Sequence, residues 1–133
     1  MILGEQLIMI SGIGVDIVEK NRFEKAINKF GDRISLKILS QNEHNEYLES
    51  KDKPSYLSKK FAAKEAFSKA FGSGLYRKGI YPKLITVNHN SFGKPFFSFA
   101  ENLDSLFKNK FKNIQLSITD SDSQSIAFVI IEQ

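Results

Sequence analysis

Residues 58–74, SKKFAAKEAFSKAFGSG, constrain the fold more than any other part of this sequence. Ala, Lys, Glu and Phe dominate the opening of this segment and no β-branched residue interrupts it, so its helix propensity is high. Pro54 suits the first turn of a helix, and Gly72 suits the position just after the last turn. The segment therefore predicts a long helix around which the rest of the chain is organised.

One side of this helix mixes apolar and charged residues in an unusual way. At about 100° per residue, an apolar stripe is formed by Tyr56, Leu57, Phe61, Phe67 and Phe71. Lys60 and Lys64 lie within the stripe, and Glu65 and Lys69 lie on its flank, one turn apart. One interpretation is a pair of snorkelling lysines beside a Glu–Lys helix pair that contributes about 0.2–0.5 kcal/mol. The other is a carboxylate and several ammonium groups at the edge of a cleft, which suits a metal and a phosphate.

The composition is typical of a single globular domain, which we expect to span residues 1–133. The chain has 133 residues, of which 41% are hydrophobic and 26% charged. It has no cysteine, which excludes disulfides and thiol chemistry and agrees with a reducing compartment. The net charge of +4 favours an acidic partner without choosing among nucleic acids, phosphorylated ligands and acidic proteins.

The apolar N-terminal run at residues 1–18 does not have the features of a targeting segment. It lacks a basic start and contains Glu5, so we do not interpret it as a signal peptide. No uninterrupted apolar run approaches the roughly 20 residues that a membrane-spanning helix needs. The sequence therefore predicts a cytoplasmic protein without a membrane partner.

The first half of the chain predicts one strand followed by helices. Ile and Val content favours a buried strand at 7–18, in which Gly12 and Gly14 indicate a close backbone approach, a bulge or a bend. Asp16 lies in the same apolar run, as either a strand-end cap or a metal ligand. Helices are predicted at 19–30, from about 31 or 32 to 39, and from a capping box of Ser40 and Glu43 to about 48. The first of these helices has one basic side, formed by Lys20, Arg22, Lys25 and Lys29.

The second half predicts an α+β arrangement. Its elements are strands 84–88 and 95–99 around a turn at 90–93, a helix at 101–111, and strands 114–119 and 126–131 around a turn at 120–124. The segment between the long helix and the first of these strands, LYRKGIYPK at 75–83, is predicted to be a loop. Lys94, next to the first turn, could contact a phosphate or simply be solvated.

Four segments together resemble the holo-acyl-carrier-protein synthase family, the small phosphopantetheinyl transferases. They are GIGVDIVEKNRF at 12–23, KKFAAKEAFSKAFGSG at 59–74, NSFGKPFF at 90–97 and LSITDSDSQSIAFVI at 116–130. The resemblance covers residues 10–131. It implies an α+β fold in which an antiparallel sheet packs against a long central helix and shorter helices, assembled as a homotrimer with active sites at subunit interfaces.

The resemblance also implies a reaction. The 4′-phosphopantetheine group of coenzyme A is transferred to a serine of an acidic apo acyl-carrier protein, with Mg²⁺ as cofactor, adenosine 3′,5′-bisphosphate as by-product and fatty acid biosynthesis as the process served. Asp16 and Glu65 match the magnesium ligands, and Lys69 matches a phosphate contact. Glu65 and Lys69 are thus the expected catalytic residues. The base that takes the serine proton is either metal-bound water or Glu65 acting through a water.

Further contacts are implied by the same motifs. Lys64, which lies in the second motif, is expected to contact the coenzyme together with Lys69. Gly72, Ser73 and Gly74 match the loop that meets the nucleotide portion. Arg22 matches a residue that grips the acidic carrier protein.

Asp120 departs from the family pattern, because family members usually have His at this position. We expect Asp120 and Lys94 to lie at the coenzyme site, where an ionised Asp would repel a phosphate. Three arrangements would avoid this repulsion: Asp120 turns away, pairs with a lysine such as Lys69 or Lys94, or binds a water of the metal shell.

Two rival functions remain open at this point. Basic residues within 20–29 and exposed Phe side chains would suit a nucleic-acid-binding domain, but 19 Lys and Arg stand against 15 Asp and Glu and are dispersed, so we expect no nucleic-acid partner. The second rival is a catalytically impaired homologue that only binds carrier protein, which the Asp at position 120 would explain.

Overall fold

The structure is a computed structural model that describes residues 7–133. Residues 1–6, which include the Glu5 used above to argue against a signal peptide, lie outside the described residues. The elements are β1 (Ile10–Glu19), α1 (Lys20–Phe30), a 3-10 helix (Gly31–Ile34), α2 (Ser35–Ile38), α3 (Gln41–Leu48), α4 (Lys53–Phe71), a 3-10 helix (Pro82–Leu84), β2 (Ile85–His89), β3 (Pro95–Phe99), α5 (Glu101–Phe107), β4 (Asn113–Asp120) and β5 (Gln124–Glu132). The predicted α+β class is confirmed, with every predicted helix and strand present.

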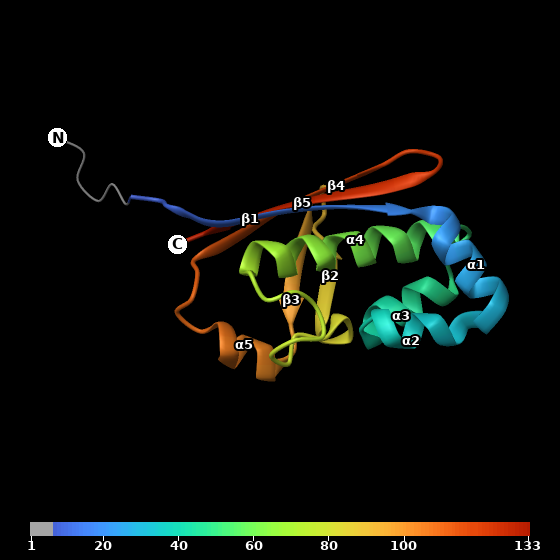
Figure 1. The fold of residues 1–133 in the computed structure, drawn as a ribbon, viewed down its shortest axis with the longest axis horizontal. Coiled ribbons are helices and arrows are strands. Elements are labelled where there is room, and N and C mark those ends of the chain that lie inside the picture. Colours follow the sequence, from blue (N-terminus) through green and yellow to red (C-terminus); the bar gives the residue numbers. More distant parts are fainter. Residues whose placement is uncertain (1–6) are drawn as a thin grey trace.

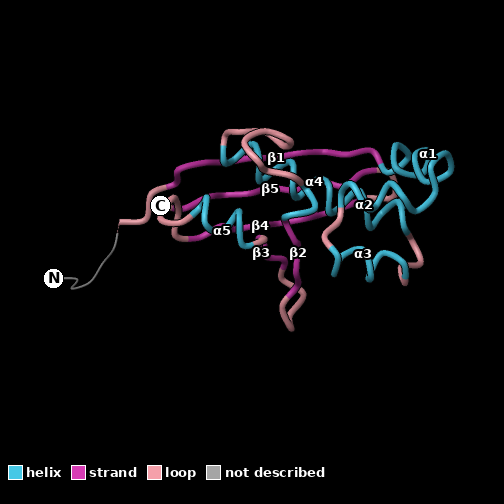
Figure 2. The backbone as a smooth tube through the Cα atoms, turned by 90° about the horizontal axis from the view of Figure 1, so that it is seen from below, coloured by secondary structure: helices cyan, strands magenta, loops and turns pink. Residues whose placement is uncertain are grey.

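The elements are arranged around α4 (Figure 1). Strands β1, β5 and β4 form an antiparallel sheet in that order, and the sheet lies along one side of α4. Strands β2 and β3 pair separately, as an antiparallel hairpin that runs crosswise to α4. Helices α1, α2 and α3 gather at one end of α4 and α5 lies toward the other end, while Figure 2 shows the tip of the β2–β3 hairpin extending away from the rest of the chain. The two predicted hairpins are thus confirmed, although they belong to two separate sheets.

Sequence features at both ends of α4 explain its length. The Asp52 carboxylate accepts a hydrogen bond from the Ser55 amide at 3.1 Å, and Pro54 occupies the first turn. Gly72 ends the helix with φ = 95°, and its amide donates to the Ser68 carbonyl. The helix is buried on nearly every side rather than along one stripe, because the sheet, the hairpin and α1–α3 all pack on it.

Gly12 and Gly14 allow β1 to lie directly against α4. A Cβ atom at Gly12 would be 2.0 Å from the Ala70 carbonyl oxygen, and one at Gly14 would be 1.9 Å from that of Ala66. Any side chain at these positions would collide with the helix backbone. The predicted close backbone approach is confirmed, and it fixes where β1 lies relative to α4.

Aromatic packing holds the other end of α4. The Phe67 ring lies 5.1 Å from the Phe99 ring and 5.5 Å from the Phe107 ring, which joins α4 to β3 and α5. Helix α5 ends at Phe107, four residues before the predicted end, and Asn109 then adopts a left-handed conformation with φ = 65°. The prediction of a helix to residue 111 was therefore too long, because a left-handed residue cannot continue it.

The outer face of the β1–β5–β4 sheet is apolar and exposed. Ile13, Val15 and Ile17 of β1 are 63%, 55% and 55% exposed, and Phe128 of β5, paired with Val15, is 42% exposed. Alternate residues such as Gly14 and Val18 face α4 instead. An apolar sheet face of this kind on a protein surface indicates an interface.

Candidate active site

Asp16 and Lys69 form the first part of the site. The Lys69 ammonium group donates to Asp16 Oδ1 and to the Val15 carbonyl oxygen, both at 3.0 Å. The Asp16 side chain is 16% exposed, and that of Lys69 is 53% exposed. Lys69 thus reaches across the free edge of β1 from α4, and the nearby Gly14–Ala66 contact sets the spacing of the two elements. The structure assigns Asp16 an ion pair rather than a strand-end cap.

Glu65 lies one turn before Lys69 and completes an acidic pair with Asp16. Burial and the neighbouring Asp16 carboxylate raise the pKa of Glu65, and Lys69 and Arg22 partly oppose that increase. The three residues expected at the reaction centre are therefore brought together by the fold, with Arg22 within electrostatic reach. We refer to Asp16, Glu65 and Lys69 as the Asp16–Glu65 cluster.

The Asp16–Glu65 cluster fits a magnesium ion that is shared with a substrate. Within residues 7–133, no group of three or more His, Asp or Glu side chains could hold a metal by itself. Magnesium is commonly bound through one or two carboxylates together with substrate phosphates and water. Asp16 and Glu65 provide two such carboxylates, so the donor set is compatible with Mg²⁺ in the presence of a pyrophosphate.

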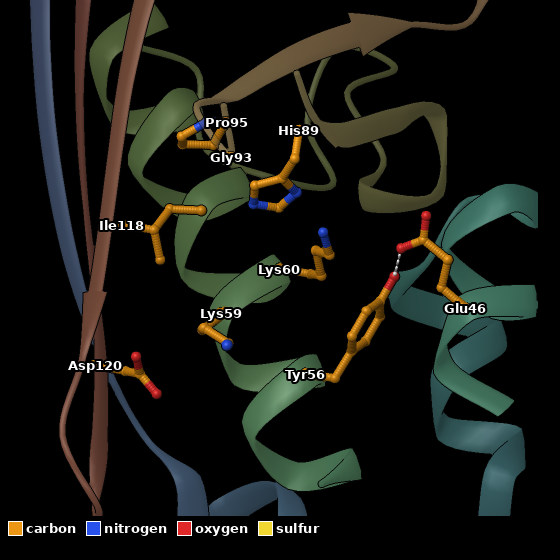
Figure 3. Close-up of a pocket in the computed structure, with 9 residues that line it drawn as sticks. All are labelled: Glu46, Tyr56, Lys59, Lys60, His89, Gly93, Pro95, Ile118 and Asp120. Atoms are coloured by element: carbon orange, nitrogen blue, oxygen red, sulfur yellow. Dashed lines mark hydrogen bonds between the residues drawn. The ribbon is translucent and has the colours of Figure 1, made fainter. Parts of the chain in front are cut away.

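A cavity of about 350 Å³ forms a second part of the candidate site, and of its lining residues the sequence had placed only Asp120 at the coenzyme site. It is lined by Glu46, Tyr56, Lys59, Lys60, His89, Gly93, Pro95, Ile118 and Asp120, as Figure 3 shows. Burial lowers the pKa of Lys60, whose ammonium group donates to the Val87 carbonyl at 3.2 Å. Burial and the neighbouring Lys60 also lower the pKa of His89. The ammonium groups of Lys59 and Lys60 in this cavity suit an anion such as a phosphate, with His89 as a further hydrogen-bonding group.

Lys60 was noticeable in the sequence, as a charge inside an apolar stripe, but its partners were not. Lys59 and His89 had no signal in the sequence that set them apart. These residues meet only because α4, β2 and β4 converge, as Figure 3 shows.

Asp120 lies in this cavity and is paired with Lys20 of α1. The Lys20 ammonium group donates to Asp120 Oδ2 at 2.8 Å and to the Ser121 carbonyl at 2.6 Å. The Lys20 hydrogen bond lowers the pKa of the Asp120 carboxyl, against a smaller opposing effect of burial. Of the three expected arrangements the structure therefore has the lysine pair, but the partner is neither Lys69 nor Lys94.

Lys64 is placed in the core, and the structure does not support its expected contact with the coenzyme. Its side chain has no exposed surface, and its ammonium group donates to Glu43 Oε1 at 2.5 Å and to the Ile38 carbonyl at 2.8 Å. Burial lowers the pKa of Lys64 to about 8, although the Glu43 carboxylate counteracts part of this effect. We therefore reassign Lys64 to the packing of α3 against α4.

The remaining expected coenzyme contacts lie near the two parts of the site. Lys94 is exposed and lies between two residues that line the cavity, and its amide donates to the Asn90 side chain at 3.0 Å. Gly72, Ser73 and Gly74 follow the Asp16–Glu65 cluster at the end of α4. Their amides all donate to the Ser68 carbonyl, at 2.9, 3.2 and 3.4 Å, so they stabilise the helix end.

The Asp16–Glu65 cluster and the cavity lie on different sides of α4. Glu65 follows Lys60 by five residues, which places the two side chains about 140° apart around the helix axis at 3.6 residues per turn. The fold of one chain thus brings Asp16, Glu65 and Lys69 together, but it does not bring Asp120, Lys94 and the cavity to them.

Arg22 is exposed on α1 beside the Asp16–Glu65 cluster. Its guanidinium lies 5.6 Å from the centre of the Phe23 ring and 5.2 Å from that of Phe61. These cation–π contacts hold the side chain against α4 while its polar edge stays accessible. The position suits contact with an acidic partner.

The fold and these two parts of the site are those expected of a small α+β enzyme, and comparison with known proteins identifies its family. Residues 12–129 match the family model described as the 4′-phosphopantetheinyl transferase superfamily. The chain belongs to this family.

Individual relatives agree with this assignment. A holo-[acyl-carrier-protein] synthase of Nitrosospira multiformis is 40% identical over 126 residues, which cover 94% of this chain and 100% of the relative. The crystal structure of the synthase from Neisseria meningitidis is 36% identical with a TM-score of 0.89, covering 94% of this chain and 100% of that one. The synthase from Bacillus anthracis, solved in complex with CoA (3′,5′-ADP), is 35% identical with a TM-score of 0.78, covering 94% and 98%.

These comparisons confirm the predicted family and the prediction that the chain is an enzyme of the phosphopantetheinyl transferase class. In residues 7–133, no helix combines the length and apolar character needed to cross a membrane.

Proposed function

We propose that this protein transfers the 4′-phosphopantetheine group of coenzyme A to a serine of an apo acyl-carrier protein, and so serves fatty acid biosynthesis in the cytoplasm. The observation that carries the proposal is the Asp16–Glu65 cluster, where two carboxylates and one ammonium group meet at the free edge of β1. Relatives named holo-[acyl-carrier-protein] synthase, which include solved structures from Bacillus anthracis and Helicobacter pylori in complex with coenzyme A, support the choice of substrate.

In the proposed reaction, the serine oxygen forms a bond to the β-phosphorus of coenzyme A, which carries the pantetheine arm. The bond from that phosphorus to the bridging oxygen breaks, and the electron pair leaves with adenosine 3′,5′-bisphosphate. Asp16 and Glu65 would hold Mg²⁺, which when bound offsets the charge of the pyrophosphate. Lys69 stabilises the negative charge that develops on the leaving phosphate.

The serine must also lose its proton. Burial and the Asp16 carboxylate raise the pKa of Glu65, so its carboxylate accepts a proton more readily than that of an ordinary Glu. We assign Glu65, directly or through a water, as the group that accepts this proton. The chain needs no His or Cys nucleophile for this chemistry.

The carrier protein is proposed to bind along α1. Arg22 lies beside the Asp16–Glu65 cluster, and the helix carries further cations along its exposed side. At its C-terminal end, Phe30, Arg33, Ile34 and Lys37 line an open cavity of about 270 Å³. Positive charge around a small apolar depression complements an acidic helix with an apolar anchor.

We further propose that the enzyme is a homotrimer in which the active site lies between subunits. The exposed apolar face formed by Ile13, Val15, Ile17 and Phe128 is available for another copy of the chain. An adjacent copy could then bring its Lys59–Lys60 cavity to the Asp16–Glu65 cluster, so that the nucleotide of coenzyme A binds in one subunit and its pyrophosphate reacts on the next. Val15→Glu should give monomers by light scattering with little turnover; a trimer with normal turnover would contradict this assembly.

The function is tested by mass spectrometry of apo acyl-carrier protein after incubation with the enzyme, coenzyme A and Mg²⁺. A phosphopantetheine adduct is expected with the parent protein and not with Glu65→Gln, which keeps the side-chain shape but removes the charge that binds a hard cation. The Gln variant should unfold at the same or a higher temperature, because it removes repulsion from Asp16. A parent protein that binds the carrier without modifying it would instead identify an impaired binding homologue.

A further inference from the structure

The loop at residues 75–83, LYRKGIYPK, is well anchored but projects its polar and aromatic side chains outward. Leu75 and Ile80 are 8% and 0% exposed, whereas Tyr76 and Tyr81 are 54% and 44% exposed. The Tyr76 amide donates to the Ile80 carbonyl at 2.7 Å, which closes the segment between the two apolar anchors. The loop is therefore anchored at both ends of this closed segment, and none of the site contacts described above involves it.

The backbone of this loop is held in an unfavourable conformation. Among residues 7–133, only Tyr76, Lys78 and Asn109 adopt a positive φ without being glycine, with values of 66°, 55° and 65°. Asn tolerates this region well, but Tyr and Lys do not. Such outliers concentrate where a binding function depends on the side chain's direction. Here the strained backbone sets where the Tyr76 ring and the Lys78 ammonium group point.

The surface of the loop combines aromatic rings with positively charged residues. The rings of Tyr76 and Tyr81 are 6.1 Å apart in an edge-to-face arrangement. The segment contains Arg77, Lys78 and Lys83 and no Asp or Glu. Rigid tyrosines that present both an apolar ring and a hydroxyl are enriched at protein interfaces, and their few rotatable bonds make ordering them inexpensive.

The loop begins six residues after Lys69, at the end of α4 that carries the reaction centre. Burial and the charge of Glu65 raise the pKa of the Tyr76 phenol, and the charge of Arg22 acts in the opposite direction. Tyr76 is thus within electrostatic reach of both Glu65 and Arg22. A carrier protein that contacts Arg22 and delivers its serine to Glu65 would pass over this loop.

We propose that the 75–83 loop is a second docking surface for the acidic carrier protein, in which the two tyrosines pack on apolar side chains of the carrier and the loop cations face its carboxylates. This inference rests on the proposed function, because the carrier is the acidic partner that the function requires. The loop and α1 would then contact the carrier on two sides of the modified serine and orient its hydroxyl toward Glu65.

Replacing the strained residues with glycine tests the proposal without destabilising the fold. Tyr76→Gly and Lys78→Gly remove the side chain and also relieve the positive φ, so both should unfold at the same or a higher temperature. We expect each to weaken binding of apo acyl-carrier protein by about fivefold or more, equivalent to about 1 kcal/mol, while the dissociation constant of coenzyme A stays within about twofold. Asn109→Gly is the matched control, since it changes a positive-φ residue outside the loop.

Titration calorimetry with apo carrier protein and with coenzyme A separates the outcomes. Unchanged carrier affinity in both glycine variants would overturn the docking surface, as would a loss of coenzyme affinity instead. A change from the parent's oligomeric state by light scattering would also overturn it, because the loop would then bind another copy of the chain. If the parent protein forms the adduct and the variants bind carrier normally, only this inference fails; if the parent neither modifies nor binds the carrier, the proposed function fails as well.

Discussion

Replacing Gly14 with Ala should damage both the stability and the activity of the protein. Gly14 lies two residues before Asp16 on β1 and faces the turn of α4 that carries Glu65 and Lys69. Ala is the smallest residue with a Cβ atom, so the substitution changes little except the space between the two elements. It therefore isolates the effect of the β1–α4 distance.

The size of the effect follows from the geometry of that contact. The added Cβ would lie 1.9 Å from the Ala66 carbonyl oxygen and 2.8 Å from the Ala70 amide nitrogen. A carbon and a carbonyl oxygen approach to about 3.3 Å at closest, so the strand and the helix must separate by about 1.4 Å. Both partners are backbone atoms of a buried helix, and no side chain can rotate away. We expect a loss of about 3 kcal/mol in the free energy of unfolding, at the upper end of the usual cost of overpacking.

The activity should fall by more than the loss of folded protein explains. A separation of about 1 Å moves Asp16 away from Glu65 and Lys69, and a misplacement of that size can cost about 100-fold in rate. Urea unfolding gives the stability change, and turnover per folded molecule is measured with the adduct assay at low temperature.

Ser11→Ala is the control for this experiment, because it lies on the same strand and loses only one 3.3 Å hydrogen bond to the Ile131 carbonyl. The reasoning about the β1–α4 contact is refuted if Gly14→Ala unfolds within about 0.5 kcal/mol of the parent protein, a difference typical of a neutral surface substitution. A destabilised variant with normal turnover per folded molecule would refute the link from this contact to the site.

Three further substitutions test individual assignments. Lys64→Met should lower the free energy of unfolding by about 3–5 kcal/mol, because it leaves the Glu43 carboxylate buried without its ion pair. The KM for coenzyme A should not change in the folded variant, and a large increase in that KM would show that Lys64 contacts the coenzyme. Asp120→His should lower the KM for coenzyme A by about fivefold, since it removes a negative charge from the cavity and frees Lys20. Steady-state kinetics with coenzyme A and Mg²⁺ varied separately measure this change. A raised Mg²⁺ requirement would mean instead that Asp120 binds a water of the metal shell. Arg22→Ala should raise the KM for carrier protein and flatten the increase of that KM with salt, because steering by exposed charge weakens as the Debye length shortens to about 8 Å at 0.15 M. An equal salt dependence of the KM in the parent protein and the variant would show that Arg22 does not contact the carrier.

The local features of the fold could be predicted from the sequence because their causes are local. The length of α4 follows from its composition and from Pro54 and Gly72, and the capping box of α3 is visible in the spacing of Ser40 and Glu43. The strand order β1–β5–β4 could not be predicted in the same way, because β1 pairs with a strand more than 100 residues later. The close packing of Gly12 and Gly14 could be anticipated as one possibility, but the sequence does not say which backbone approaches.

The candidate site could likewise be predicted only where the positions of its residues depend on local sequence. Asp16, Glu65 and Lys69 could be proposed from two motifs, because each motif places its residues on a single element. The partners of buried or half-buried charges could not be predicted. Lys64 pairs with Glu43, which the sequence reveals only as a helix cap. Asp120 pairs with Lys20, which lies 100 residues earlier in the chain. Charge inside an apolar stripe therefore marked residues with unusual surroundings, but it did not distinguish a ligand contact from a core ion pair.

The placement of the two parts of the site on one helix limits the assemblies that this protein can form. Glu65 and Lys60 point about 140° apart around α4, and we therefore propose that a coenzyme at the Asp16–Glu65 cluster of one chain reaches the cavity of another. A two-fold dimer would place the cluster and the cavity of its two chains in reciprocal contact, whereas a larger ring would place them in heterologous, head-to-tail contact. Heterologous contacts close into rings when the rotation between subunits allows it. The proposed trimer is the smallest ring with heterologous interfaces, and it would have one complete site at each interface.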